Sequence, residues 1–218
     1  FIDNVEVYLK AIRGNAILST KGLLELARIL RMCRNLNDYF YSKDGLISED
    51  YAILDNYFNS LYTNKNIEDV IFSNILDENT INDNASKKLY TIRKSFRKLE
   101  QDIKSKLNNF IHSSTYSKYI QESVVTIRND RYVIPVKQEY RGQVKGFIHD
   151  FSSSGSTVFI EPMAVFELNN EINNLRVEEN IEIERILKDY TELFAPIVNE
   201  IENNIRIIGR LDFIFAKA

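Results

Sequence analysis

The chain has 218 residues, enough for one or two domains, and its 44% hydrophobic and 27% charged residues are typical of a globular protein. Its net charge of −3 excludes a whole-chain basic footprint for nucleic acid, so any such binding has to come from a local patch. The single cysteine, Cys33, excludes a disulfide framework and is expected in a helix core. Neither an apolar run of membrane-spanning length nor a signal peptide is present, so we expect a cytoplasmic protein without membrane contact.

Residues 1–85 are predicted to form a helical core, because apolar residues recur there every three or four positions. The clearest stripe lies at residues 20–40, and its predicted buried side chains are Leu23, Leu26, Ala27, Leu30, Cys33, Leu36 and Phe40. A brief hairpin is predicted around Asp77-Glu78-Asn79. Helices are expected at 1–13, at 20–40, after Ser48 and after Asn66, with Ser19, Ser48 and Asn66 as N-caps and breaks at Gly14 and Asp44-Gly45.

Two long helices with narrow apolar seams are predicted to pair as an antiparallel arm. The ascending helix is assigned to residues 86–122, is capped by Ser86 and is most regular from Lys87 to Ser113. The returning helix is assigned to 162–195, because Pro162 suits a first helical turn, and Pro196 should kink or restart the chain before a last segment at 196–218. The two seams are Leu89, Ile92, Phe96, Leu99, Ile103, Leu107 and Phe110, and Leu168, Ile172, Leu175, Ile186, Leu193, Ile197, Ile201, Ile205, Ile208 and Leu211.

Opposite charges on the two arm segments favour this pairing. Residues 87–106 hold eight Lys or Arg and two Asp or Glu, a net charge of +6, whereas residues 161–204 hold eleven acidic and three basic residues, a net charge of −8. Flanking charges of opposite sign are typical of a helix pair. The basic run from Lys87 to Lys98 is therefore interpreted as an intramolecular partner in preference to a nucleic-acid site.

Residues 123–161 alone show strand-like alternation, and four short antiparallel strands are predicted at 124–128, 131–136, 144–151 and 156–161. Asn129-Asp130 predicts a tight two-residue hairpin, and Ser152-Ser153-Ser154-Gly155 predicts a second turn. Pro135 has no N–H to donate, so the second strand is expected at a sheet edge or bulged there. So small a module needs support from the flanking helices, and we expect it to be a tip or a platform on the arm rather than a free domain. The predicted fold is mainly α with a small antiparallel β module.

The β module carries the candidate nucleic-acid-binding residues, which are Arg128, Arg131, Lys137, Arg141 and Lys145. Tyr132 and Tyr140 interleave with these cations, and the acidic residues of the segment are Asp130 and Glu139. A modest phosphate-binding patch and a solvated strand face explain this pattern equally well. Lys137 and Lys145 flank the connection that holds Arg141, so these three are expected to converge at one end of the module, with Arg131 apart.

Residues for catalysis or cofactor binding are not recognisable in the chain. It has no phosphate-binding loop of the GxxxxGK[ST] type, and its two histidines, His112 and His149, cannot make a zinc site of ordinary spacing with one cysteine. Ser153-Ser154-Gly155-Ser156 is interpreted as a turn first and as an anion nest second. The chain itself is therefore expected to be no enzyme and to hold no metal or cofactor.

Three segments resemble the MutS-two family, the second bacterial lineage of MutS proteins. The run RNDRYVIPVKQEYRGQVKGFIHDFSSSGSTVFIEPMAVFELNNEI resembles its clamp, Asp83-Asn84-Ala85-Ser86 with Ile92-Arg93 resembles the motif that opens its arm helix, and residues 211–218 resemble the core helix that leads to its ATPase domain. Because the chain opens at Phe1 and stops inside a helical pattern at Ala218, we interpret it as a core and lever-clamp fragment without that ATPase domain.

The resemblance implies a parent that is an ATP-driven homodimer, with ATP and Mg²⁺ held in the ATPase domain and often with a nuclease domain. It further implies binding of branched or mismatched DNA with suppression of recombination, or of collided ribosomes in ribosome rescue. DNA and ribosomal RNA both present phosphates, so the two substrates stay open. The alternative is a structural arm that contacts a protein or a second copy through Tyr132, Tyr140, Phe147 and Phe151.

Overall fold

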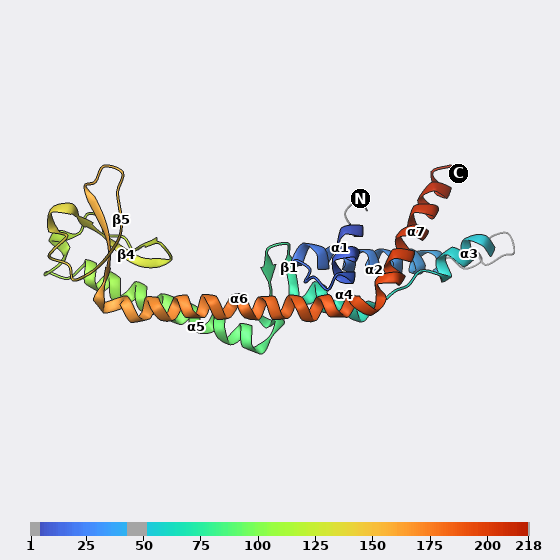
Figure 1. Cartoon of the computed structure of the whole chain (residues 1–218), viewed down its shortest axis with the longest axis horizontal. Helices are drawn as coiled ribbons and strands as arrows, with labels where there is room; N and C mark the ends of the chain where they lie inside the picture. The colour runs from blue at the N-terminus through green and yellow to red at the C-terminus, as the bar shows by residue number, and fades with distance from the viewer. Residues whose placement is uncertain (1–4, 43–51, 218) are drawn as a thin grey trace. The chain divides into compact units, whose positions relative to one another are not determined.

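The computed structural model describes residues 5–42 and 52–217, which form two compact units (Figure 1). The first unit comprises residues 1–87 and 182–218, and the second comprises residues 88–181. The fold is mainly α-helical with small antiparallel sheets, as predicted. The expected break at Asp44-Gly45 and the expected cap at Ser48 lie outside the described residues. In the described part of the chain, no helix is both long and apolar enough to span a membrane.

The first unit is built around α2, whose apolar stripe lies at the centre of its core. Leu23, Leu26, Ala27, Leu30 and Cys33 are all fully buried, as the sequence predicts, and burial raises the pKa of the Cys33 thiol to about 12. The elements of this unit are α1 (Val5–Arg13), α2 (Thr20–Tyr41), α3 (Ala52–Asn59), α4 (Lys65–Asn74), β1 (Ile75–Asp77), β2 (Thr80–Ile81), η2 (Asp83–Ala85), the end of α6 (Phe166–Phe194), η6 (Ala195–Ile197) and α7 (Val198–Phe215).

Two helix starts in this unit test the predicted N-caps. The Ser19 hydroxyl accepts a hydrogen bond from the Gly22 backbone N–H, which confirms Ser19 as the cap of α2. The prediction of Asn66 as the cap of α4 is wrong by two residues. Asn64 has the extended backbone of an N-cap, and its side chain accepts from the Ile67 N–H at 3.1 Å. Asn66 lies within the first helical turn.

The predicted interruption at Pro196 is confirmed, because α6 ends at Phe194 and α7 begins at Val198 after one 3₁₀ turn. The prediction that Leu193, beside this break, belongs to the buried seam is wrong. Leu193 is 37% exposed, whereas its neighbour Phe194 is fully buried. The helix therefore presents Phe194 to the core of the first unit.

In the second unit, α5 (Lys87–Ile111) and α6 lie antiparallel, since residues further along α5 contact residues earlier in α6. The Arg93 guanidinium bonds the Glu179 carboxylate at 2.7 Å, and the Arg176 guanidinium lies 5.7 Å from the centre of the Phe96 ring. Ile103 and Leu107 belong to the same buried cluster as Ile172 and the sheet, with Phe96, Leu99 and Phe110 packed on its margin. The predicted ascending helix is too long, because α5 ends at Ile111 and η3 (Ser117–Tyr119) follows a turn.

The β module is a four-stranded antiparallel sheet with the order β3-β4-β6-β5. Its strands are β3 (Thr126–Arg128), β4 (Arg131–Lys137), β5 (Gly146–Phe151) and β6 (Thr157–Pro162), with η4 (Gln138–Tyr140) after β4 and η5 (Met163–Val165) before α6. Asn129 and Asp130 both have positive φ angles, of 49° and 62°. They form the predicted two-residue hairpin turn between β3 and β4.

Pro135 lies in neither of the predicted settings, an edge strand or a bulge, since β4 has neighbours on both sides and pairs with β6 without a register shift. β3 pairs with β4 only as far as Val133, however. Beyond that residue, Ile120 pairs with Val136 on the same side of β4. The Pro135 carbonyl accepts from the Gln121 N–H, so the missing N–H of Pro135 faces this side. The ladder with β6 consequently loses no hydrogen bond.

Pro162 does not open the returning helix as predicted. It is the last residue of β6, pairs with Gly146 of β5 and has extended backbone angles. The next residue, Met163, still donates its N–H to the Lys145 carbonyl, so the strand ladder continues past the proline. α6 begins only at Phe166, after the 3₁₀ turn.

Candidate nucleic-acid interface

The connection from β4 to β5 separates two of the predicted phosphate-binding residues. β4 and β5 both pair antiparallel with β6, on its opposite sides, so they run parallel to each other. Lys137 pairs with Thr157 at the start of β6, whereas Lys145 precedes the residue that pairs with Pro162 at its end. Thr157 and Pro162 lie about 16 Å apart along β6 at 3.3 Å per residue. The expected convergence of Lys137, Arg141 and Lys145 at one end is therefore wrong.

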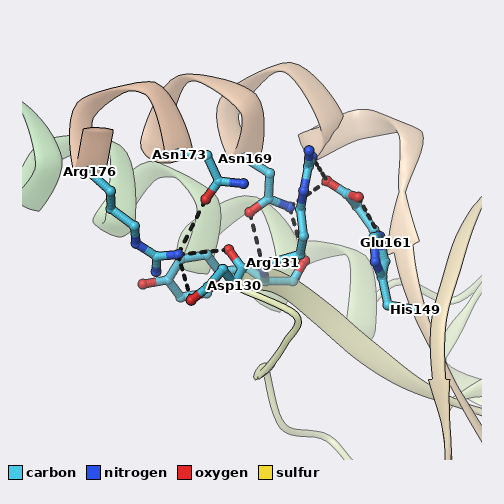
Figure 2. Close-up of polar contacts among 8 residues, drawn as sticks. Asp130, Arg131, His149, Glu161, Asn169, Asn173 and Arg176 are labelled. Atoms are coloured by element: carbon cyan, nitrogen blue, oxygen red, sulfur yellow. Dashed lines mark hydrogen bonds and ion pairs between the residues drawn. The ribbon is translucent and has the colours of Figure 1, made fainter. Parts of the chain in front are cut away.

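Arg131 holds a buried carboxylate (Figure 2). The Glu161 side chain is fully buried, and one of its oxygens accepts from the Arg131 guanidinium at 2.9 Å and from the Asn169 amide at 2.7 Å. Asn169, on α6, also bonds both the N–H and the carbonyl of Tyr132. Because a buried charge needs partners, this network fastens the sheet to α6 and engages Arg131 structurally.

His149 completes this network because β5 contains one extra residue. Ile148 pairs with Ile160 and Asp150 with Phe159, so His149 is the unpaired residue of a bulge. Its Nε2 lies 2.7 Å from the second oxygen of Glu161. The Asn129 side-chain amide donates to the His149 carbonyl at 3.0 Å, which ties the bulge to the β3–β4 turn.

Arg128 and the β3–β4 turn are also engaged within the unit. The Arg128 guanidinium pairs with Asp150 at 3.2 Å and lies 4.1 Å from the centre of the Phe159 ring. The Arg176 guanidinium bonds both the carboxylate and the carbonyl of Asp130, as Figure 2 shows. The Arg128 contacts fix the hairpin to β5 and β6, and the Arg176 contacts fix it to α6.

Tyr132 does not interleave with the surface cations, because it is only 2% exposed. Its hydroxyl donates to Glu100 of α5 at 2.8 Å. Burial, and then this hydrogen bond, raises the pKa of Tyr132 to about 12. Hydrogen bonds from Lys104 and then from Tyr132 lower the pKa of Glu100. Tyr132 is consequently a core residue that links β4 to α5.

A surface that the sequence did not predict forms where η3 lies beside η4, and we call it the η3–η4 surface. The Lys137 ammonium donates to the Lys118 carbonyl at 3.2 Å, and the rings of Tyr119 and Tyr140 lie 5.1 Å apart. Lys118 and Arg141 are exposed, whereas Lys137 and the two tyrosines are half-buried. The surface is made of Lys118, Tyr119, Lys137, Tyr140 and Arg141.

Lys118 and Tyr119 were missed because residues 86–122 were assigned to one helix. The run Ser113-Ser114-Thr115 is a helix-ending signal that would have placed them in a connection. Among residues 5–42 and 52–217, no group of three or more His, Cys, Asp or Glu side chains could hold a metal ion. What the η3–η4 surface offers is positive charge beside aromatic rings, which suits an anionic polymer.

Comparison with known proteins gives relatives that match along essentially the whole chain, although no known family profile matches it. The chain is 49% identical to a protein named Endonuclease MutS2 from Acetivibrio thermocellus over 100% of its length. It is 44% identical to proteins of the same name from Ruminiclostridium cellulolyticum and Clostridioides difficile, over 100% and 99% of its length. It spans 27% of the length of each of these relatives. The chain is therefore MutS-like and belongs to the MutS2 family.

Proposed function

We propose that this chain is a nucleic-acid-binding segment of its parent protein and that the η3–η4 surface contacts phosphate groups. The observation that carries the proposal is the contact of Lys137, at the end of β4, with Lys118 of η3, together with the exposed position of Arg141 directly after η4. Arg128 and Arg131 are engaged with carboxylates of the same unit, so they belong to the scaffold. Lys145 lies at the other end of β6 and forms no part of this surface.

The names of the relatives support the same class of ligand. They are called endonucleases, and an endonuclease acts on nucleic acid. We propose that the parent is a homodimeric ATPase whose ATP and Mg²⁺ bind outside residues 1–218. Its substrate would be branched or mismatched DNA, with suppression of recombination, or the RNA of collided ribosomes, with ribosome rescue.

Charge reversal tests the proposal. The double variant Lys137→Glu and Arg141→Glu should weaken binding of the 218-residue chain to a four-way DNA junction or to purified ribosomes. Each lost phosphate contact should lower the dependence of log affinity on log salt by about one unit, because fewer counterions are released. Fluorescence anisotropy for the junction and sedimentation for ribosomes measure both quantities between low and moderate salt.

Lys145→Glu is the matched control, since it reverses one charge in the same connection but at the opposite end of β6. It should leave the affinity and the salt dependence nearly unchanged. Unchanged binding of the double variant to both ligands, with normal folding, would overturn the proposal. An effect of the control on log affinity about half as large as that of the double variant would show that net charge, and not this surface, governs binding, because the control reverses one charge and the double variant reverses two.

The second candidate is a protein-interaction arm, and exposed apolar residues on the edge strand β5 favour it. Phe147 is 47% and Phe151 is 50% exposed. Tyr132, which the sequence placed in such an interface, is excluded by its burial. Association through these aromatic residues should be insensitive to salt, whereas phosphate contacts should weaken steeply as salt rises.

A further inference from the structure

The serine-rich turn between β5 and β6 lies at the same end of the sheet as Lys137. Lys137 pairs with Thr157, and Phe151 pairs with Val158, so residues 152–156 project beyond these pairs. The Gln138 N–H, at the start of η4, donates to the Ser156 carbonyl at 3.0 Å. The turn is therefore fastened directly beside the η3–η4 surface.

Hydrogen bonds within the turn give it a defined shape. The Ser152 hydroxyl accepts from the Thr157 N–H at 3.0 Å, and the Gly155 N–H donates to the Ser152 carbonyl at 2.8 Å. Gly155 has a φ angle of 72°, a conformation that a residue with a side chain rarely adopts. The hydroxyl oxygens of Ser154 and Ser156 lie 2.8 Å apart. Ser153 to Ser156 are all exposed, so a fixed backbone presents several hydroxyl groups to solvent.

We propose that this turn contacts the phosphodiester backbone of the nucleic acid that the η3–η4 surface binds, with Ser153 and Ser154 as uncharged donors. The inference rests on the proposed function and extends its site. Serine hydroxyl and backbone N–H groups are common phosphate partners in nucleic-acid complexes and fix the register of the strand without reading bases. Being neutral, they release no counterions, so they contribute to affinity but not to its salt dependence.

The test compares serine and cation variants of the 218-residue chain on a fluorescently labelled four-way DNA junction. The double variant Ser153→Ala and Ser154→Ala should weaken binding about threefold to tenfold at every salt concentration, as expected for one or two lost hydrogen bonds. Its salt slope should equal that of the unchanged chain. Ser152 is left intact because it shapes the turn.

A second variant, Ser153→Glu, places a negative charge beside the expected phosphates and should weaken binding more than tenfold. Its matched control is Ser95→Glu, which adds the same charge at an exposed position of α5 in the same unit. Ile103 is a buried residue of α5 that packs in the same cluster as the sheet, and Ser95 lies eight residues before it, about 12 Å along the helix. Ser95→Glu should therefore leave the affinity unchanged. Circular dichroism and the thermal midpoint establish that each variant folds.

The outcomes separate the inference from the proposed function. Wild-type binding by the serine variants, with weakened binding by Lys137→Glu and Arg141→Glu, overturns the inference and leaves the proposed function standing. A loss of affinity in the double alanine variant that comes with a lower salt slope also overturns it, because the turn would then act only through the neighbouring cations. Wild-type binding by both the serine and the cation variants overturns the proposed function and the inference together.

Discussion

At the scale of single residues, Glu161 organises the β module. Its fully buried carboxylate has partners on three elements, Arg131 of β4, His149 of β5 and Asn169 of α6. Glu161→Ala would leave the Arg131 guanidinium, itself only 20% exposed, without its counter-charge. We therefore expect the free energy of unfolding to fall by about 3 kcal/mol or more in urea titrations.

The surface pair of Arg128 and Asp150 is the control for this prediction. Both side chains are more than a third exposed, and the ion pair is 3.2 Å long. Asp150→Ala should cost less than about 1 kcal/mol, because solvent screens an exposed pair. Equal losses for the two variants would show that the buried network does not stabilise the module.

At the scale of elements, the start of β5 depends on a glycine. A Cβ atom at Gly146 would overlap the backbone carbonyl of Glu161, which cannot move without disrupting the β5–β6 ladder. Gly142, in the connection that precedes β5, has no atom within 4 Å of the corresponding position. Gly146→Ala should therefore lower the free energy of unfolding by about 1–3 kcal/mol, the usual cost of overpacking.

Gly142→Ala is the matched control, and it should change stability by less than about 0.5 kcal/mol. Urea unfolding followed by far-ultraviolet circular dichroism measures both variants. A Gly146→Ala chain as stable as the control would show that β5 can shift to accommodate the methyl group.

Local chemistry explains which elements the sequence predicted. Asn129-Asp130 encodes its hairpin because a two-residue turn needs positive φ angles. Pro196 interrupts the helical run because a proline inside a helix removes a backbone hydrogen bond and its ring clashes with the preceding turn. The prediction that Pro162 opens a helix is wrong because the fixed φ of proline suits the end of a strand as well as the start of a helix. The pairing of Pro162 with Gly146, which is a tertiary contact, places Pro162 in β6.

The candidate site was less predictable because it depends on strand order. Lys137 and Lys145 lie eight residues apart in sequence, and only the insertion of β6 between β4 and β5 sends them to opposite ends. Lys118 joins Lys137 through a backbone carbonyl, a contact that no spacing in the sequence indicates. The engagement of Arg131 with Glu161 likewise spans 30 residues.

At the scale of the whole molecule, the buried residues of ranges 5–42 and 52–217 form two hydrophobic cores. One surrounds α2 and includes Leu30, and the other joins α5, α6 and the sheet and includes Ile134. The two units divide within α6, between Ile181 and Glu182, so this helix contributes to both. Stability is expected to vary between such units, because each can open by a separate local unfolding reaction.

Truncation of one core residue at a time tests this independence. Leu30 and Ile134 are both fully buried, so Leu30→Ala and Ile134→Ala should each cost about 2–5 kcal/mol in the unit concerned. Hydrogen exchange measured by mass spectrometry should then quicken in α2, α4 and α7 for Leu30→Ala, and in β4 and β6 for Ile134→Ala. Equal acceleration throughout both units by either variant would mean that α6 couples the cores into one cooperative structure.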